Sequence, residues 1–473
     1  MKPSLAQPFP RDSQVASGGP YVPAGPSAAN QGQGILDWIN VQASPYNATG
    51  DGQLVTNAAM ASGSTTLTSA SGKFAAGDVG KTIIVYGAGA SGGILATTIT
   101  AYNSTGSVTL AAANAAGTNV SGLSAIWGTD DTAALQAAIS AAEALAAGYE
   151  PQTLAAVVYL PFGIYVTQTL SVTSAFRLTG DGPGSLLVTG GSALIDFGNN
   201  YITGLEFDHF GADVTGGHIF TDVNLHRCSF HHLQLIQESY NFSIMSFGNS
   251  GSGLSNTEFH EIMFTGYGNP ANNFNRTVSL WSLHNPGDKN IDVVTWRKCS
   301  FLWNPPSWVT APDNSQWVWD VECTATDSGG YNDRLTFDQC DGGSCLGGLI
   351  RIVAAQGVLI NQAGAGNIYT QDGKSVGHSM IYIGSGTNSN ANARATTITG
   401  YTRETSGTIS WGSFYDIEVD ASTVTTTIIT PCATGMGSPL RINLNGSNGV
   451  IINPDANVYY PAGGNGSGTV VIG

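Results

Sequence analysis

Basic side chains are scarce in this sequence. Its 473 residues include 16 Lys and Arg against 32 Asp and Glu, which gives a formal net charge of −16 at pH 7. The basic residues are also scattered along the chain. Because a surface that binds phosphate groups needs clustered Lys and Arg, we expect neither nucleic acid nor an anionic membrane among its partners.

Long apolar runs are missing as well. The first residues, MKPSLAQPFPRDSQ, contain no apolar segment of the kind found in secretion signals. No later run approaches the roughly 20 apolar residues that a membrane span requires. We therefore expect a soluble protein that does not insert into a membrane and is not processed by standard secretion.

Cysteines are few for a chain of this length. Six are present, and the pair Cys340 and Cys345 has no second pair at the spacing of a metal site. The sequence predicts mostly buried free thiols, made in a reducing cytoplasm, with no metal and no cofactor.

Glycine, by contrast, is abundant, with 62 residues, and only 10% of the chain is charged while 42% is hydrophobic. This composition predicts an all-β protein with many turns and a large core. Residues 1–34 are rich in Pro, Gly, Ser, Ala and Gln, which is typical of a flexible arm or docking peptide. Residues 53–127 contain alternating runs such as STTLTSA and KTIIVYG, which indicate a small inserted β module.

One helix is expected after that module, in GTDDTAALQAAISAAEALAAG, ending near Gly148. Its apolar face at helical spacing comprises Leu135, Ala138, Ile139 and Ala142. Asp130 or Thr129 is placed to cap the first turn, so capping explains Asp130 and Asp131 better than catalysis does. Such a helix would cover the open end of a solenoid.

Nine short apolar strands recur in the C-terminal two-thirds of the chain, with starts 24 to 38 residues apart. This spacing fits one coil of a right-handed parallel β-helix, in which each rung packs on its neighbours. The nine strands begin at Leu194, His218, Ser243, Ser279, Trp317, Leu349, Met380, Phe414 and Pro439.

A second strand in each rung shows an apolar residue followed three positions later by another. We expect these residues to stack in two interior columns, which would make three cysteines part of the core. The first column is predicted to hold Phe207, Leu225, Phe259, Trp296 and Phe337. The second is predicted to hold Phe210, Cys228, Ile262, Cys299 and Cys340.

Three segments, DDTAALQAAI, VVYLPFGIYV and LTGDGPGSLLV, resemble the N-terminal signature of the pectate-lyase-like β-helix proteins, bacteriophage tailspikes in particular. ATGDG at residues 48–52 resembles the turn that lies directly before the DDT helix in that family. The motifs cover about residues 35–190. Segments 35–52 and 128–190 would then start the β-helix, and residues 191–473 would form its body.

The resemblance implies a homotrimeric receptor-binding protein of a phage tail, synthesised in the host cytoplasm. Its arm would bind a virion tail or baseplate protein, and its partner on the host would be a bacterial surface polysaccharide. The family includes lyases, hydrolases, esterases and spikes without known activity, so it does not specify the chemistry.

The first candidate site lies among the outward positions of the first strands. Their alignment puts Asp320 and Glu322 on one face of one strand, with His284 below and Arg351 above. Two carboxylates at about 5 to 9.5 Å are what glycoside cleavage needs. The whole outward column is predicted to hold Asp196, Phe220, Ser246, Ser282, Asp320, Arg351, Tyr382, Asp416 and Arg441.

A second candidate site combines carboxylates and imidazoles on adjacent rungs of the second strands, which suits acid and base roles. Asp208, His226 and His260 would form one ladder within it. The full group is Glu206, Asp208, His226, Glu258, His260 and Glu261.

Each candidate has a simpler alternative. Acidic residues in outward columns are often just solvated. Trp303 and Trp308, in the long loop FLWNPPSWVT, suit stacking on sugar rings, with packing at a subunit interface as the alternative. Trp319 points inward by strand alternation.

We favour glycosidic hydrolysis of a surface polysaccharide by the Asp320 and Glu322 pair, without a cofactor. A non-catalytic adhesive spike is the rival interpretation. A polysaccharide lyase is a further alternative, disfavoured by the missing signal peptide and the docking-like arm.

Overall fold

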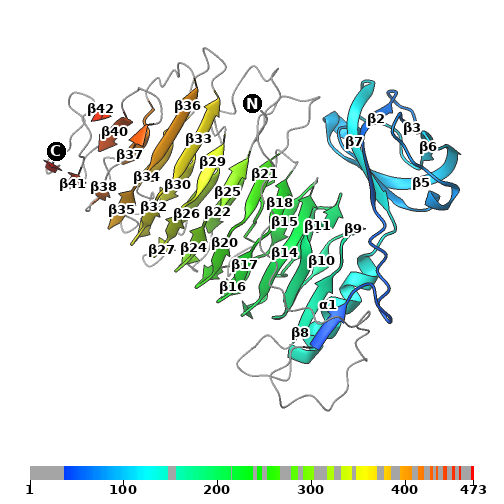
Figure 1. The fold of residues 1–473 in the computed structure, drawn as a ribbon, viewed down its shortest axis with the longest axis horizontal. Coiled ribbons are helices and arrows are strands. Elements are labelled where there is room, and N and C mark those ends of the chain that lie inside the picture. Colours follow the sequence, from blue (N-terminus) through cyan, green and yellow to red (C-terminus); the bar gives the residue numbers. More distant parts are fainter. Residues whose placement is uncertain are drawn as a thin grey trace, which may run out of the picture.

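The computed structural model describes residues 37–146, 156–214, 216–237, 242–247, 253–266, 279–285, 291–302, 317–323, 332–343, 348–369, 378–384, 395–406, 414–419, 427–429, 433–434, 440–444, 450–452, 458–459 and 470–472. They form a right-handed parallel β-helix with one helix and a small barrel at its N-terminal end (Figure 1). The fold prediction is therefore confirmed. Among the described residues, no helix is both long and apolar enough to cross a membrane.

The largest sheet runs the length of the solenoid, and all of its strand pairs are parallel. It starts with β1 (Asp37–Asn40), β8 (Ala156–Leu160), β9 (Gly163–Val166), β11 (Arg177–Thr189) and β14 (Glu206–Val214). From there the coils up to β38 and β39 each add two short strands that lie end to end, and β41 and β43 continue the first strip. The first strip contains β17 (Ser229–His231), β20 (Glu258–His260), β24 (Thr295–Arg297), β28 (Thr336–Asp338), β32 (Leu359–Asn361), β35 (Thr396–Thr399), β38 (Thr427–Ile429), β41 (Val450–Ile452) and β43 (Val470–Ile472). The second strip contains β18 (Gln234–Gln237), β21 (Met263–Gly266), β25 (Ser300–Leu302), β29 (Asp341–Gly343), β33 (Gly364–Tyr369), β36 (Thr402–Ser406) and β39 (Ala433–Thr434).

Three smaller parallel sheets complete the coils. One consists of β13 (Ile202–Thr203), β16 (Asn224–His226), β19 (Gly253–Ser255), β23 (Ile291–Asp292), β27 (Asn332–Asp333) and β31 (Ala355–Gln356). Another consists of β10 (Leu170–Ser171), β12 (Ala193–Asp196) and β15 (His218–Thr221). The last consists of β22 (Trp281–Asn285), β26 (Trp319–Cys323), β30 (Ile350–Val353), β34 (Ile381–Gly384), β37 (Ile417–Val419), β40 (Leu440–Leu444) and β42 (Val458–Tyr459).

A single residue with positive φ separates the two strips of the large sheet in each described coil from β17 and β18 to β35 and β36, and the same occurs within β14. His209, His232 and Glu261 take this left-handed conformation with φ of 53°, 54° and 51°. The left-handed residue interrupts the alternation of the strand, so two consecutive side chains point outward between two buried ones. In the second rung, for example, His231 and His232 lie between the buried Phe230 and Leu233.

Aromatic residues on the inner face of the large sheet stack on one another in the core of the solenoid. The ring of Trp296 lies 4.7 Å from Phe337 and 5.7 Å from Phe259, with nearly parallel planes. The cysteines Cys228, Cys299 and Cys340 are buried free thiols, as predicted.

One rung of the predicted columns is wrong. Phe230, not Leu225, pairs with Phe207 and Phe259. Leu225 and Cys228 lie five residues earlier in the coil, and Leu225 pairs with Ile202 on the six-stranded sheet. Phe230 and Leu233 have the same three-residue spacing as Leu225 and Cys228, so the pattern alone could not distinguish them.

The outward column of the first strands is correct over Ser282, Asp320, Arg351 and Tyr382 and wrong at both ends. Asp196 pairs with Thr221, so Phe220 lies inward. Tyr382 pairs with Glu418, which pairs with Asn443, two residues beyond the predicted Asp416 and Arg441. At the C-terminal end the slip is of two residues, which preserves strand alternation, so the apolar pattern does not reveal it.

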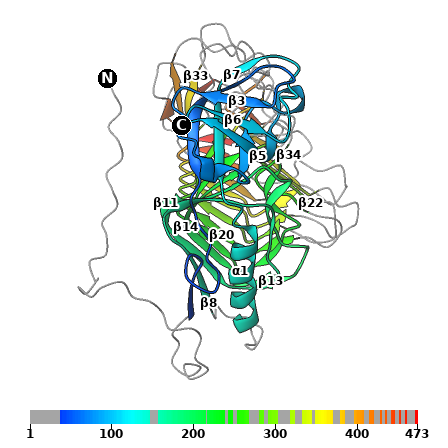
Figure 2. The same cartoon turned by 90° about the vertical axis from the view of Figure 1, so that its right-hand side faces the viewer.

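The helix α1 (Thr132–Ala146) covers the N-terminal end of the coil, where Figure 2 shows it facing the viewer beneath the barrel. The four predicted apolar residues are all buried against the solenoid core. The carboxylate of Asp130 accepts the backbone N–H of Thr132 at 3.0 Å. That of Asp131 accepts the N–H groups of Thr49 and Gly50 at 2.6 and 3.0 Å, so the ATGDG turn and the helix lie together in space.

A closed antiparallel barrel interrupts the start of the solenoid. Its strands are β2 (Gln53–Met60), β3 (Thr66–Ser69), β4 (Thr82–Val85), β5 (Leu95–Ser104), β6 (Ser107–Leu110) and β7 (Val120–Gly128). Two short 3-10 turns, η1 (Ala76–Asp78) and η2 (Ala90–Gly92), connect them. The chain leaves and re-enters the solenoid at one point, where Asp51 accepts the N–H of Thr129 at 2.8 Å and pairs with Lys81 at 2.8 Å.

The barrel rests on the solenoid through a buried contact. Tyr86 and Ile126 of the barrel pack against Val166 and Val188 of the solenoid. At this contact the hydroxyl of Tyr86 donates to the buried carboxylate of Asp213, with 2.9 Å between the oxygens.

Candidate functional site

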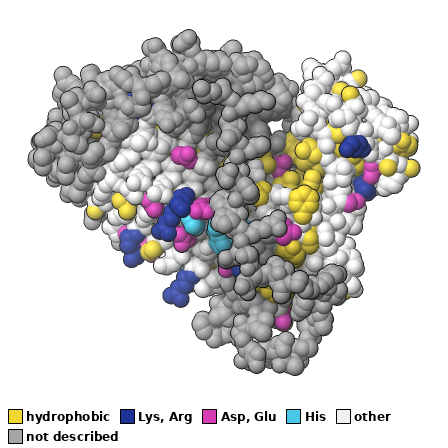
Figure 3. All heavy atoms as spheres, in the orientation of Figure 1, with side chains coloured by type: hydrophobic (Ala, Val, Ile, Leu, Met, Phe, Trp, Pro, Cys, Tyr) yellow, Lys and Arg dark blue, Asp and Glu magenta, His cyan; other side chains and the backbone are white. Residues whose placement is uncertain are grey.

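The outer face of the large sheet carries two neighbouring columns of polar side chains, because two consecutive side chains point outward at each corner. The first column is Asp208, His231, His260, Arg297, Asp338, Asn361 and Thr399. The second, made of the left-handed residues, is His209, His232, Glu261, Lys298, Gln339 and Gln362. Figure 3 shows histidine, acidic and basic side chains gathered near the middle of this view.

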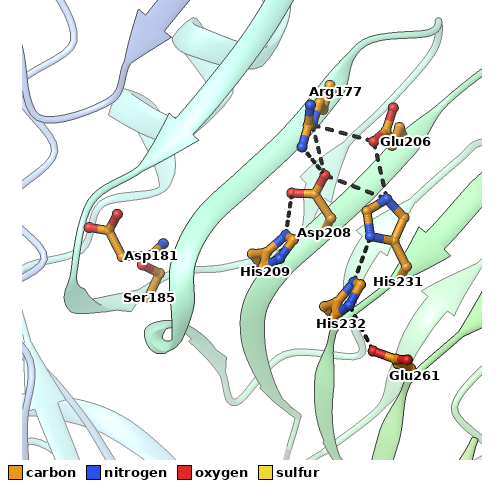
Figure 4. Close-up of polar contacts among 9 residues, drawn as sticks. All are labelled: Arg177, Asp181, Ser185, Glu206, Asp208, His209, His231, His232 and Glu261. Atoms are coloured by element: carbon orange, nitrogen blue, oxygen red, sulfur yellow. Dashed lines mark hydrogen bonds and ion pairs between the residues drawn. The ribbon is translucent and has the colours of Figure 1, made fainter. Parts of the chain in front are cut away.

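Arg177 joins two carboxylates at the N-terminal end of these columns (Figure 4). Its Nε and Nη2 lie 2.7 and 2.6 Å from Asp208 Oδ2, and its Nε lies 3.4 Å from Glu206 Oε1. Asp208 is fully buried. Burial alone would raise the pKa of Asp208, but hydrogen bonds from His209 and Thr179 and the charge of Arg177 outweigh it and lower the pKa to about 2. Asp208 is therefore a permanently ionised anchor that an extended substrate does not reach.

The two histidines of the next rung face each other. His231 Nδ1 and His232 Nδ1 are 2.9 Å apart. His231 Nε2 lies 3.1 Å from Glu206 Oε1, and His232 Nε2 lies 2.8 Å from Glu261 Oε2. Partial burial and the neighbouring histidines lower the pKa of His232 against the opposing effect of Glu261.

Glu261 also receives Lys298 Nζ at 3.1 Å and lies 3.4 Å from His260 Nε2. Partial burial would raise the pKa of Glu261, but Lys298 and the two adjacent histidines lower it. Glu258 pairs only loosely with Arg297, at 3.3 Å, and both side chains are about half exposed.

A separate cluster lies on the seven-stranded sheet, over three consecutive rungs. Arg351 on β30 donates from the single atom Nη1 to Asp320 Oδ1 at 2.6 Å and to Glu322 Oε2 at 2.7 Å, both on β26. His284 Nε2 on β22 lies 3.0 Å from Asp320 Oδ2, and Ser279 donates its hydroxyl to the same oxygen at 3.1 Å. We call His284, Asp320, Glu322 and Arg351 the Arg351 cluster.

The charges within the Arg351 cluster lower the pKa of Asp320 and raise the pKa of His284. Burial would raise the pKa of Asp320, but the hydrogen bond and charge of His284 and the charge of Arg351 lower it. Burial would lower the pKa of His284, but Asp320 and Glu322 raise it above its usual value. The cluster thus pairs an ionised carboxylate with an imidazole that keeps its proton to higher pH.

The structure brings together the four residues predicted for the first site. It does not form the second site as predicted, because His226 is on the six-stranded sheet and its place beside Asp208 is taken by His231. Glu206 and Asp208 lie at β14, whereas Glu258 and His260 lie two rungs further along, on β20. Trp303 and Trp308 lie outside the described residues.

Sequence reasoning missed Arg177, His209, His231 and His232. The available signal was a repeated pattern of two polar residues between two apolar ones, as in FDHF, FHHL, FHEI, WRKC and FDQC. Strict strand alternation hides this signal, because it places one of the two polar residues inside.

Within the described residues, three groups of side chains offer ligand atoms within 4.8 Å of one another. One consists of His209, His231 and His232. The others are Glu206, Asp208 and His231, and His284, Asp320 and Glu322. Arginine already neutralises carboxylates in the last two groups, which leaves the histidine group as the best suited to a cation.

No protein-family profile matches the sequence, and no curated protein matches it. Solved structures do align with it at low similarity. A Geobacillus virus E2 protein, ORF18, aligns with 14% identity and a TM-score of 0.46, over 70% of this chain and 59% of that one. The chain thus spans less than two-thirds of that protein.

Two further alignments are similar in quality. The Streptococcus pneumoniae surface protein and adhesin PfbA has 12% identity and a TM-score of 0.40, over 73% of this chain and 93% of its own. The tailspike protein gp49 from Pseudomonas phage LKA1 has 11% identity and a TM-score of 0.33, over 89% and 67%. At this level of similarity the function must be argued from the site itself.

Proposed function

We propose that this protein binds a polysaccharide of a bacterial surface and hydrolyses it at the Arg351 cluster. The observation that carries the proposal is the convergence of two carboxylates, an imidazole and a guanidinium on three consecutive rungs, with contacts of 2.6 to 3.0 Å. A solenoid presents such a group on a long rigid surface, which suits an extended polymer.

The proposal gives the members of the cluster different roles. The acid of a glycosidase needs a raised pKa, and the lowered pKa of Asp320 does not suit that role. His284, whose pKa is raised, donates its proton to the glycosidic oxygen, and Asp320 holds its ring in place. Glu322, with 22% of its side chain exposed, accepts a proton from the water that attacks the sugar carbon.

A non-catalytic adhesive spike is the second candidate. It is favoured by the way in which Arg351 satisfies both carboxylates at once. A group so fully paired can also serve to bind sugar hydroxyls through its remaining lone pairs, without any proton transfer.

The test is incubation of the purified protein with surface polysaccharides from candidate hosts, followed by size analysis of the products. Hydrolysis predicts shortened glycan without the absorbance of an unsaturated uronate, whereas a lyase would generate that absorbance. Glu322→Gln and His284→Gln should each lower the rate by about 10²- to 10⁴-fold.

Two further variants separate the possible sites. Asp292→Asn removes a carboxylate that is paired with Arg334 at 3.1 Å on the six-stranded sheet, and its rate should match that of the wild type. Glu258→Gln tests the large sheet: a loss of rate there, with Glu322→Gln unaffected, would move the activity to that face. Binding without shortening of any glycan would favour the adhesive spike.

The biological setting is part of the same proposal. The resemblance of DDTAALQAAI and VVYLPFGIYV to phage tailspikes supports a homotrimer located in a virion tail. Residues 1–34, which lie outside the described residues, would attach it to a tail or baseplate protein. Light scattering of the purified protein tests the trimer, and a pull-down with and without residues 1–34 tests the arm.

A further inference from the structure

The facing histidines of the large sheet present an unusual hydrogen-bonding arrangement. The Nδ1 atoms of His231 and His232 lie 2.9 Å apart, and the opposite nitrogen of each ring contacts a carboxylate. Figure 4 shows the chain from Glu206 through the two rings to Glu261.

The tautomers follow from these contacts. A neutral imidazole carries one N–H, and a carboxylate can only accept it. Glu206 and Glu261 therefore fix the hydrogens on Nε2 of both rings, and each Nδ1 presents a lone pair. Two lone pairs that face each other at this distance repel, unless an electron-poor centre is shared between them.

The spacing of the two nitrogens matches a shared metal ion. Two imidazole nitrogens bound at about 2.0–2.1 Å lie about 2.9 Å apart at a right angle and about 3.4 Å apart at a tetrahedral angle. The observed 2.9 Å corresponds to the first value. A displacement of either Nδ1 atom by about half an ångström gives the second.

The surroundings supply the other features of a metal site. One ring nitrogen of His209 lies within 4.8 Å of the ligand atoms of His231 and His232. The His209 ring stacks on His232 with centroids 4.6 Å apart and its Nδ1 contacts Asp208, so it becomes a third ligand through Nε2 once its ring turns. Carboxylates that hold the distal N–H of ligating histidines are the usual second layer of such sites. Three carboxylates (Glu206, Asp208, Glu261) and two cations (Arg177, Lys298) meet here, which leaves a net negative charge for a cation to balance.

We propose that His231 and His232, with His209 as third ligand, bind a divalent late first-row transition-metal ion such as Zn²⁺, Ni²⁺ or Cu²⁺. Neutral imidazole is a preferred ligand of these ions, whereas Ca²⁺ and Mg²⁺ prefer oxygen. The site lies on the large sheet, away from the Arg351 cluster on the seven-stranded sheet, so it is independent of the proposed hydrolysis. Because it joins two successive rungs, the ion would also brace the outer face of the solenoid.

The test is calorimetric titration of chelator-treated, untagged protein with Zn²⁺, repeated with Co²⁺ while visible absorbance is recorded. We expect one ion per chain with micromolar or tighter affinity. His231→Gln and His232→Gln should abolish this binding, and Glu261→Gln should weaken it by about 10–100-fold. The matched control is His226→Gln, a histidine of the adjacent sheet whose Nδ1 contacts Ser255, and it should bind as the wild type does.

Three results would overturn the proposal. The first is no binding at micromolar affinity by folded wild-type protein, as judged by circular dichroism. The second is binding that survives both histidine variants, which would place the ion elsewhere. The third is a low-field N–H resonance from His231 or His232 that is unaffected by added metal, which would show that the pair shares a proton instead.

Discussion

Replacement of Asp213 by Asn should make this protein more stable at neutral and alkaline pH. The Asp213 carboxyl is buried between the barrel and the solenoid, where it accepts a hydrogen bond from Tyr86 while its Oδ1 has no partner within the described residues. Burial raises its pKa from 3.8 to about 7, against a smaller opposing effect of the Tyr86 hydrogen bond.

The magnitude follows from the shift. Because the folded protein binds the proton more tightly than the unfolded chain, stability is complete below about pH 4 and falls as pH rises toward about 7. The free energy of unfolding lost across this window is about 4 kcal/mol, at about 1.4 kcal/mol for each unit of pKa. Asn is neutral at every pH, so Asp213→Asn should remove this slope.

The assay is urea unfolding of wild type and Asp213→Asn at several pH values from about 4 to 8. The free energies of unfolding of the two proteins should be nearly equal at the acidic end. As pH rises, the variant should become increasingly more stable than the wild type. Tyr86→Phe removes the bond that favours the ionised form of Asp213, so the loss of stability should continue to higher pH than in the wild type, at the same slope. Parallel curves for wild type and Asp213→Asn across the whole range would refute the reasoning.

Three other changes have defined outcomes. Arg403→Leu leaves the fully buried Asp416 without its ion-pair partner, so it should lower the free energy of unfolding by about 3–5 kcal/mol, measured by urea unfolding. Val293 is a β-branched residue with φ of 53°, so Val293→Asn should raise the free energy of unfolding by about 1 kcal/mol, measured in the same way. Arg351→Gln removes a charge that lowers the pKa of Asp320, so the acid limb of any glycan cleavage profile should move to higher pH.

Each of these predictions has a contrary result. An unchanged free energy of unfolding in Arg403→Leu would mean that water reaches Asp416. A destabilised Val293→Asn would mean that the packing of the valine side chain outweighs its backbone strain. An unchanged pH profile for Arg351→Gln would separate Asp320 from the chemistry.

The core of the solenoid could be predicted because the same buried positions recur in successive coils. Phe259, Trp296 and Phe337 repeat at similar positions in successive coils, and burial demands an apolar residue at each. The Arg351 cluster was also predictable, because plain strand alternation holds along β26 and places Asp320 and Glu322 on one side.

The cluster of His209, His231 and His232 on the large sheet could not be predicted from strand alternation. At His232 the backbone adopts a left-handed conformation, so His231 and His232 lie on the same face of the sheet. Strict strand alternation would place them on opposite faces. Apolar spacing also failed to set the register at Leu225 and Cys228, because Phe230 and Leu233 repeat the same interval. Only hydrogen bonding between rungs decides such cases, and that depends on the whole coil.

The junction at Asp51 and Thr129 has a consequence for engineering. With the outgoing and returning chain held 2.8 Å apart by a hydrogen bond, the barrel adds almost nothing to the path of the solenoid backbone. Insertions whose ends lie close together are readily tolerated in proteins. We expect this junction to accept a short loop or an unrelated compact domain in place of the barrel, which would make the solenoid a carrier with an interchangeable head.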